Sequence, residues 1–408
     1  MDDLSTQVGG NIRRIRRGHG IALADLADAS GLSKSFLSRV ERGERHVDRR
    51  SHLDALANAL SCSIGTLIGG PTTAGGATQQ VALATVPQLR RALRSAEIDY
   101  VDRTAAIVPI EILRARAMDL WNARRACDYA KVAALLPHLV QDLYLSSKIG
   151  PDRDHALRLY VEVCSAAAFS LRGLNHGDLA WIAAQQCCKA AQDLDDPIAI
   201  GFAEFTRSHA SVLETGYASA LHIAEQAADA IRPYLSDDDP EAARVYGTLL
   251  LTAAWGASVA GNKSQIRTYV DEAAAVGDRV GDPLPEGDAW QTYFGPTNTR
   301  IWQMTIVVEA GEGGKVVDLA RDADLSVIDS KSRQAEFWTQ FGCGIAQEHN
   351  RENVAVDAIL KANRLAAQRT RNNPHVRAAV SSLLDRSYRH TSRQLLGLAR
   401  YVGAMPSN

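Results

Sequence analysis

The chain has 408 residues, of which 46% are hydrophobic and 23% charged, and its formal net charge is −2. A chain of this length buries a large core and is too long for one small domain. No apolar run approaches the roughly 18 residues of a membrane span, and the opening Met-Asp-Asp-Leu-Ser lacks the basic and apolar regions of a signal peptide. We therefore expect a cytoplasmic protein that does not bind a membrane.

Two short amphipathic helices joined by a tight turn are predicted within residues 20–43. Their apolar faces are formed by Leu23, Leu26 and Ala27 and by Phe36, Leu37 and Val40. Between them, Gly31 supplies a left-handed turn residue and Ser33 can cap the second helix. This arrangement predicts a helix-turn-helix.

The outward face of the second helix carries short hydroxyls and long cations and no large apolar group. Such a face suits the DNA major groove, where Arg and Lys donate to guanine and Ser contacts bases or phosphates. The alternative is an ordinary solvated helix face. The predicted DNA-binding residues of this turn and helix are Ser33, Lys34, Ser35, Ser38, Arg39 and Arg42.

Positive charge is concentrated around this helix. Residues 13–50 contain ten Lys and Arg but only five Asp and Glu, although the chain as a whole is slightly negative. Further phosphate contacts are predicted for Arg13, Arg14 and Arg17 before this helix and for Arg45, Arg49 and Arg50 after it. Because the chain holds 37 Arg and only 8 Lys, arginine abundance alone is weak evidence.

The first 70 residues resemble the lambda-repressor-like DNA-binding domain of the xenobiotic-response-element (XRE) regulator family. The resemblance implies five short helices packed around one core, and base readout by Lys34, Ser35 and Arg39. It also implies a structural ion pair between Arg16 and Glu41. Where the family often has Ser or Thr followed by Gln at the start of the second helix, this chain has Ala22 and Leu23, which lack those capping and phosphate-binding side chains.

Residues 69–80 contain four Gly, one Pro and no charged residue, which is the composition of a linker. We therefore predict a DNA-binding domain over residues 1–70, a linker over 71–86 and a helical repeat domain over 87–406. Together these elements predict an all-α chain.

Beyond the linker, apolar residues recur with helical periodicity, and no alternating strand pattern is longer than a few residues. Helix pairs are predicted at 153–194, 198–231, 241–280, 296–322 and 331–369, with turns near Gly177, Gly216, Gly261, Gly311 to Gly314 and Asn350. Several helix starts combine a capping residue with a following Pro, as in Asp196-Pro197 and Asp239-Pro240. These features predict stacked helical hairpins, and the alternative is a globular helical bundle.

Four segments of this second part resemble a large group of bacterial regulators that join such a helix-turn-helix to a tetratricopeptide-like domain. They are residues 126–137, 177–184, 294–298 and 375–384. The architecture of that group is similar to the peptide-sensing regulators of quorum sensing. The resemblance implies that a concave repeat surface binds a small-molecule or short-peptide signal and changes the geometry of a homodimer.

Candidate ligand contacts are the polar and aromatic side chains at the starts and inner faces of the repeat helices. Asn can bond in both directions to a peptide backbone, and Arg can fix a carboxylate. The predicted ligand-binding residues are Arg207, Tyr246, Trp255, Tyr293, Phe294, Asn298, Trp302, Arg333 and Trp338. Packing in the core is the alternative for each of them.

Catalysis finds little support in the sequence. The chain lacks the G-x-S-x-G, H-E-x-x-H and phosphate-loop motifs, and its eleven His are dispersed. We therefore predict no catalytic residue, no metal site and no cofactor, and a repeat-bearing enzyme fused to a DNA-binding domain is disfavoured. The favoured hypothesis is a ligand-responsive, homodimeric regulator that binds a double-stranded DNA operator. The alternative is a DNA-located scaffold whose repeats bind a protein partner without a small ligand.

Overall fold

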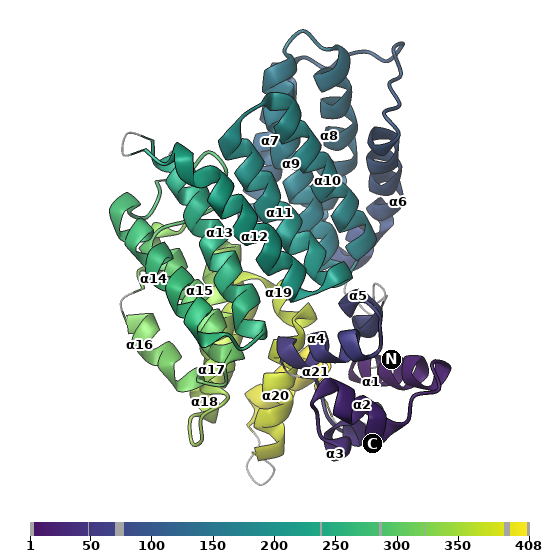
Figure 1. The fold of residues 1–408 in the computed structure, drawn as a ribbon, viewed down its shortest axis with the longest axis vertical. Helices are drawn as coiled ribbons and strands as arrows, with labels where there is room; N and C mark the ends of the chain where they lie inside the picture. The colour runs from purple at the N-terminus through teal and green to yellow at the C-terminus, as the bar shows by residue number, and fades with distance from the viewer. Residues whose placement is uncertain are drawn as a thin grey trace.

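The computed structural model describes residues 4–47, 49–69, 77–236, 239–284, 288–321, 323–386 and 392–405. Every regular element in these ranges is a helix, which confirms the all-α prediction. A small N-terminal domain is followed by a long curved stack of antiparallel helices (Figure 1). No helix in the described ranges is both long enough and apolar enough to cross a membrane.

The N-terminal domain consists of α1 (Leu4–Gly18), α2 (Leu23–Ser30), α3 (Lys34–Glu41), α4 (Arg50–Ala59) and α5 (Ile64–Ile68). Its core is formed by apolar side chains from all five helices, among them Ile12, Leu26, Leu37, Leu56 and Leu67, which are fully buried. The turn between α2 and α3 has the predicted chemistry. Gly31 adopts φ 66°, and the Ser33 hydroxyl accepts a hydrogen bond from the Phe36 N–H at 3.2 Å.

The stack begins with three helices that the sequence pattern did not pair, α6 (Ala77–Glu97), α7 (Ile110–Arg125) and α8 (Tyr129–Ile149). The predicted pairs follow as α9 (Arg153–Gly173) with α10 (Gly177–Leu194), α11 (Pro197–Thr215) with α12 (Tyr217–Ile231), α13 (Pro240–Val259) with α14 (Lys263–Val280), α15 (Pro296–Glu309) with α16 (Val316–Arg321), and α17 (Lys331–Ile345) with α18 (Glu352–Leu365). The chain continues through α19 (Ala367–Asn372), α20 (Pro374–Arg386) and α21 (Arg393–Val402). The 3₁₀ turns are η1 (Arg232–Tyr234), η3 (Gly313–Lys315) and η4 (Leu325–Val327).

Local capping explains why the hairpins begin and turn where they do. The Asp196 carboxylate accepts a hydrogen bond from the Ile198 N–H at 2.8 Å, and Asp239 accepts from the Glu241 N–H at 2.9 Å. Both are followed by Pro at the first helical position, where the missing N–H leaves no bond unmade. Gly216 and Gly261 turn the chain with φ of 85° and 72°, a conformation that glycine adopts without strain.

Part of the expected linker, residues 71–86, is helical. Residues 70–76 lie outside the described ranges, but residues 77–86 belong to α6, which continues through Pro87. The physical reason is composition. The glycines end at Gly76, and six of the ten residues 77–86 are Ala, Gln or Leu, which favour a helix.

The stack curves far enough for its two ends to meet. Helix α7 lies near the start of the stack and α17 near the end of the stack, and the two helices are in contact. Arg125 Nη1 also lies 3.7 Å from Asp329 Oδ2. The N-terminal domain packs α5 against α11 and α4 against α13. The first helices of successive hairpins and the N-terminal domain therefore surround a common interior.

Candidate functional site

Helix α3 presents a polar face to solvent. Phe36, Leu37 and Val40 anchor the opposite side of the helix in the core. Lys34, Ser35 and Arg39 are exposed, as is the capping Ser33, whereas Ser38 is half-buried. Ser33 Oγ and Ser35 Oγ lie 3.2 Å apart and share a hydrogen bond. The face is thus formed and mostly exposed, and its DNA contacts stay a prediction.

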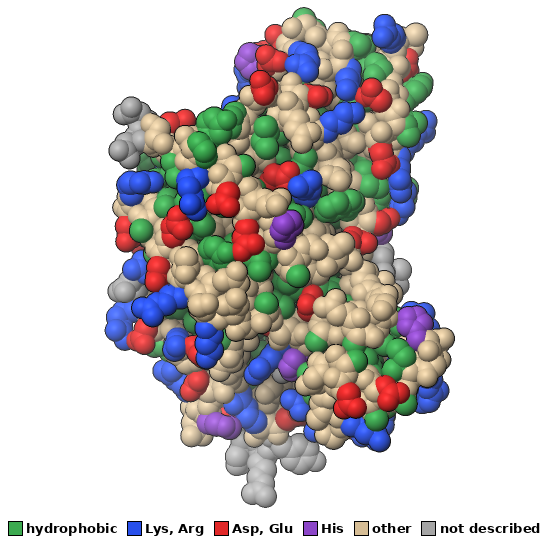
Figure 2. All heavy atoms as spheres, in the orientation of Figure 1, with side chains coloured by type: hydrophobic (Ala, Val, Ile, Leu, Met, Phe, Trp, Pro, Cys, Tyr) green, Lys and Arg blue, Asp and Glu red, His purple; other side chains and the backbone are tan. Residues whose placement is uncertain are grey.

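The flanking arginines differ in how free they are to bind phosphate. Arg13 and Arg17 are exposed on α1, and basic side chains lie along the lower and outer margins of the N-terminal domain (Figure 2). Arg42 pairs with Glu44 at 2.7 Å, and the Arg45 guanidinium lies 4.9 Å from the centre of the Phe36 ring. Arg49 is exposed and lies against the turn at Gly311. Arg42 and Arg45 therefore already contact other side chains of the chain. The predicted phosphate contact of Arg50 is wrong, because its guanidinium lies 3.2 Å from Glu309 of the stack.

Arg16 and Glu41 form a bidentate ion pair. Arg16 Nε donates to Glu41 Oε1 at 2.6 Å and Nη2 donates to Oε2 at 2.8 Å. The hydrogen bond to Glu41 raises the pKa of Arg16. The pair implied by the family resemblance is confirmed. It joins α1 to Glu41, the last residue of α3, and so gives this acidic residue a structural role. As expected, Ala22 provides no side-chain cap for α2.

A second ion pair joins the N-terminal domain to the stack. Arg50 Nη1 lies 3.2 Å from Glu309 Oε2, and the Ser51 N–H donates to Glu309 Oε1 at 3.0 Å. Glu309 is only 6% exposed. Nearby, the Tyr217 N–H donates to Asp54 at 3.2 Å. The core of the N-terminal domain is continuous with side chains of α11, α12 and α13, so the two parts share one packed interface.

Burial of this ion pair changes the acidity of both partners. Burial alone would lower the pKa of Arg50, but neighbouring Tyr217 and Glu309 together raise it. Burial alone would raise the pKa of Glu309, but Arg50, His375 and the Ser51 N–H hold it below its ordinary value. Both side chains are therefore charged at neutral pH.

Aromatic rings from four first helices meet inside the stack. The His209 ring stacks on Trp255 with centroids 5.2 Å apart, and Phe169 and Phe205 contact His209 at 5.4 Å and 4.8 Å. Trp302 lies 6.2 Å from Trp255. These residues come from α9, α11, α13 and α15, so the curvature of the stack brings them together.

Three guanidinium groups flank these rings. Arg124 lies over Phe169 at 5.8 Å, Arg172 over Trp255 at 5.6 Å and Arg333 over Trp302 at 5.8 Å. Burial lowers the pKa of Arg124 and Arg172, lowers the pKa of Arg333 to about 10, and lowers that of His209 well below its ordinary value. At neutral pH the arginines are charged and His209 is neutral. We call the set Arg124, Phe169, Arg172, Phe205, His209, Trp255, Trp302 and Arg333 the inner cluster.

Several of the predicted ligand-binding residues belong to this cluster or adjoin it. Trp255, Trp302 and Arg333 are members. Asn298 adjoins it, because its Oδ1 accepts a hydrogen bond from Arg333 Nε at 3.0 Å and its amide nitrogen donates to the Thr292 carbonyl at 3.2 Å. Tyr293 lies close enough to Arg124 to affect its pKa.

The other four predicted residues have different partners. Phe294 is fully buried, and its ring fills the space beside Gly247. The Tyr246 hydroxyl donates to Glu272 of α14. Arg207 pairs with Glu204 at 2.6 Å, and Trp338 packs on Phe341 beneath Lys361. For Phe294 and Tyr246 the packing alternative describes the structure, because helical spacing does not separate an inner face from contacts between neighbouring hairpins.

Sequence reasoning missed five members of the inner cluster: Arg124, Phe169, Arg172, Phe205 and His209. A signal was present. Phe205 and His209 are spaced i, i+4, and Phe169 and Arg172 are spaced i, i+3, so each pair shares one helix face. In the described ranges no group of three His, Cys, Asp or Glu side chains is placed to hold a metal ion.

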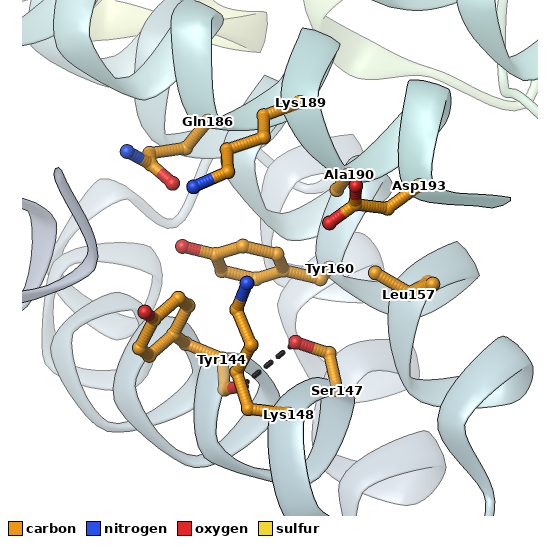
Figure 3. A pocket seen from close by; sticks show the side chains of 9 residues that line it. All are labelled: Tyr144, Ser147, Lys148, Leu157, Tyr160, Gln186, Lys189, Ala190 and Asp193. Atoms are coloured by element: carbon orange, nitrogen blue, oxygen red, sulfur yellow. Dashed lines mark hydrogen bonds between the residues drawn. The ribbon is translucent and has the colours of Figure 1, made fainter. Parts of the chain in front are cut away.

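A small hollow lies between α8, α9 and α10 (Figure 3). Its lining includes Tyr144, Lys148, Tyr160 and Lys189 and none of the predicted binding residues. It has room for little more than one water molecule. Four of the predicted ligand-binding residues, by contrast, lie at the inner cluster, which we therefore keep as the candidate site.

Comparison with known proteins identifies the N-terminal domain. Residues 11–71 match the family of the Cro/C1-type HTH DNA-binding domain, so the chain carries a DNA-binding helix-turn-helix at its N-terminus. No curated protein matches the chain. Among solved structures, Bacillus thuringiensis PlcR in complex with the peptide PapR7 and DNA is similar at 14% identity and a TM-score of 0.29, over 66% of this chain and 94% of that chain.

Proposed function

We propose that this protein is a cytoplasmic transcriptional regulator that acts as a homodimer. In this proposal residues 1–70 read a double-stranded DNA operator, and residues 87–406 bind a small-molecule or peptide signal and hold the dimer. The match to a DNA-binding domain supports the first part. The buried contact between the N-terminal domain and the stack supports control of DNA binding by the stack.

The observation that carries the proposal is the position of α15. Asn298 and Trp302, in its first two turns, lie at the inner cluster, and Glu309, its last residue, holds Arg50 of the N-terminal domain. These three positions fall on one face of the helix. A ligand that shifts α15 therefore also shifts the contact with the DNA-binding domain. Such a ligand changes operator affinity when it binds one arrangement of the two parts better than another.

Dimerisation follows from the size of the reading surface. One helix of this length contacts too few bases for specificity in a genome. Two copies of the domain would read half-sites about 34 Å apart on one side of the duplex. In this proposal, dimer contacts made by the stack set that spacing.

The test is operator binding by the full chain with and without an extract of its source cells. An operator is first selected from random duplex DNA. We expect the small-molecule filtrate of the extract to change wild-type affinity, Trp302→Ala to abolish that change, and Trp338→Ala, outside the inner cluster, to retain it. If only the protein fraction changes binding, the DNA-located scaffold replaces this proposal. If no fraction changes it, the stack has no sensing role.

A further inference from the structure

The positive charge of the inner cluster exceeds the negative charge of the carboxylates around it. The side chains of Arg124 and Arg172 form no hydrogen bond or ion pair with the described residues, and the Arg333 guanidinium donates only to the neutral amide of Asn298. The other buried arginines nearby are neutralised, since Arg50 pairs with Glu309 and Arg369 with Glu336. Because a buried charge without a counter-charge is costly, this excess is a feature to be explained.

Several polar atoms of the cluster are also buried without a partner. They are Arg124 Nη1, Arg172 Nε, both ring nitrogens of His209, and Trp255 Nε1. His209 is 6% exposed and Trp255 is 4% exposed. Each such donor or acceptor costs about 1–3 kcal/mol when it is left unpaired. Native structures keep few of them, so a concentration at one place indicates a site that another molecule completes.

The rings of the cluster are not fully covered. Phe169, Phe205 and Trp302 are half-buried, as are Arg124 and Arg172, although all of them face the interior that α7 and α17 close. Burial nevertheless lowers the pKa of these arginines. The cluster therefore combines accessible aromatic faces with strongly desolvated positive charge.

This chemistry selects one class of ligand. Guanidinium groups bind carboxylates and phosphates through paired, charge-assisted hydrogen bonds, and aromatic faces favour a planar partner. A cation would be repelled, and a neutral molecule would leave the three arginines unbalanced. We propose that the inner cluster binds a planar aromatic molecule that carries an anionic group, with Arg124 and Arg172 as its principal contacts. The assignment deepens the proposed function, because it names the class of signal for the same site.

Calorimetric titration of the full chain tests the assignment with three matched probes, 2-naphthoate, 2-naphthyl phosphate and 2-naphthamide. We expect at least one of the two anions to bind once per chain and at least tenfold more tightly than the amide. The preferred anion distinguishes a carboxylate ligand from a phosphate ligand. If the anions and the amide bind wild-type protein equally, or if neither anion binds, the assignment is wrong. This test needs no variant of the protein.

Variants locate the binding site. We expect Arg172→Gln to weaken anion binding at least tenfold, which corresponds to about 1.4 kcal/mol. Arg232→Gln is the control, because Arg232 also lies over an aromatic ring, that of Tyr246, but is near the carboxylates of Asp229 and Glu272. Arg124→Gln replaces Arg172→Gln if circular dichroism shows that the latter is unfolded. Equal weakening by the control would contradict the assignment.

Failure of the ligand assignment can be distinguished from failure of the proposed function. Operator affinity is measured with and without the bound anion. Anion binding that leaves operator affinity unchanged supports the assignment and contradicts the signalling role. Conversely, an operator affinity that responds to cell filtrate, in a protein that binds neither anion, overturns the assignment alone.

Discussion

Glu309→Gln perturbs the contact between the DNA-binding domain and the stack with little change in shape. The substitution removes one charge from a carboxylate that is 6% exposed and leaves Arg50 buried without a counter-charge. Breaking a buried ion pair costs about 3–5 kcal/mol. The glutamine carbonyl can still accept the Ser51 N–H, a hydrogen bond worth about 1 kcal/mol. The expected loss in free energy of unfolding is therefore about 2–4 kcal/mol.

Urea unfolding at pH 7, followed by circular dichroism, measures this loss. Glu312→Gln is the matched control, because Glu312 forms an exposed pair with Lys315 and such pairs contribute at most about 1 kcal/mol. If Glu309→Gln is no less stable than this control, the buried pair does not hold the two parts together, and our reasoning about the interface is wrong.

The same pair predicts a pH dependence. The pKa of Glu309 is lowered in the folded protein, so its contribution to stability is complete above its unfolded pKa of about 4.3 and is lost as the pH falls through the folded value. The stabilities of the wild type and Glu309→Gln should therefore converge in acid. A difference that is constant from pH 7 to acid would contradict an ionic origin.

Three further substitutions test other parts of the structure. Arg39→Ala should weaken binding to the selected operator by about 1–3 kcal/mol and relax preference at one base pair, as measured by fluorescence anisotropy. Glu162→Gln should raise the melting temperature more at pH 8 than at pH 5. Burial raises the pKa of Glu162 to about 7, so the wild type loses stability as the pH rises from the unfolded value of about 4.3 to the folded value. Asn298→Ala should release Arg333 and lower stability by about 1–3 kcal/mol in urea unfolding.

Each of these three predictions can be contradicted by a specific result. Wild-type operator affinity in Arg39→Ala would mean that another face of the domain reads DNA. An equal change in melting temperature at both pH values would show that Glu162 is ionised throughout. Unchanged stability of Asn298→Ala would mean that its buried hydrogen bonds to Arg333 and Thr292 contribute nothing.

Features that depend on neighbouring residues could be predicted from the sequence. Ser33 and Asp196 cap helices, and Gly216 turns the chain, because each acts on backbone groups within a few residues. The Arg16–Glu41 pair was also predictable, but only through the resemblance of the first 70 residues to a known family. The motifs in these residues were sufficient to predict both the five helices and their packing around one core.

The inner cluster could not be predicted in the same way. Arg124, Arg172 and Arg333 are separated by many residues and meet because small rotations between successive hairpins add up to a closed curve. No local pattern specifies that sum. The same limit explains why the sequence did not distinguish Phe294 from Trp302, which both lie near the start of α15. Phe294 is buried in the core, whereas Trp302 faces the interior of the stack.

Selection of operator sequences from random duplex DNA by the full chain tests the central claim most directly. We predict one enriched motif of two related half-sites with centres about 34 Å apart, bound by two copies of the chain and lost in Arg39→Ala. Recovery of no preferred sequence, or of a single half-site bound by one copy, would contradict a dimeric regulator that reads DNA through α3.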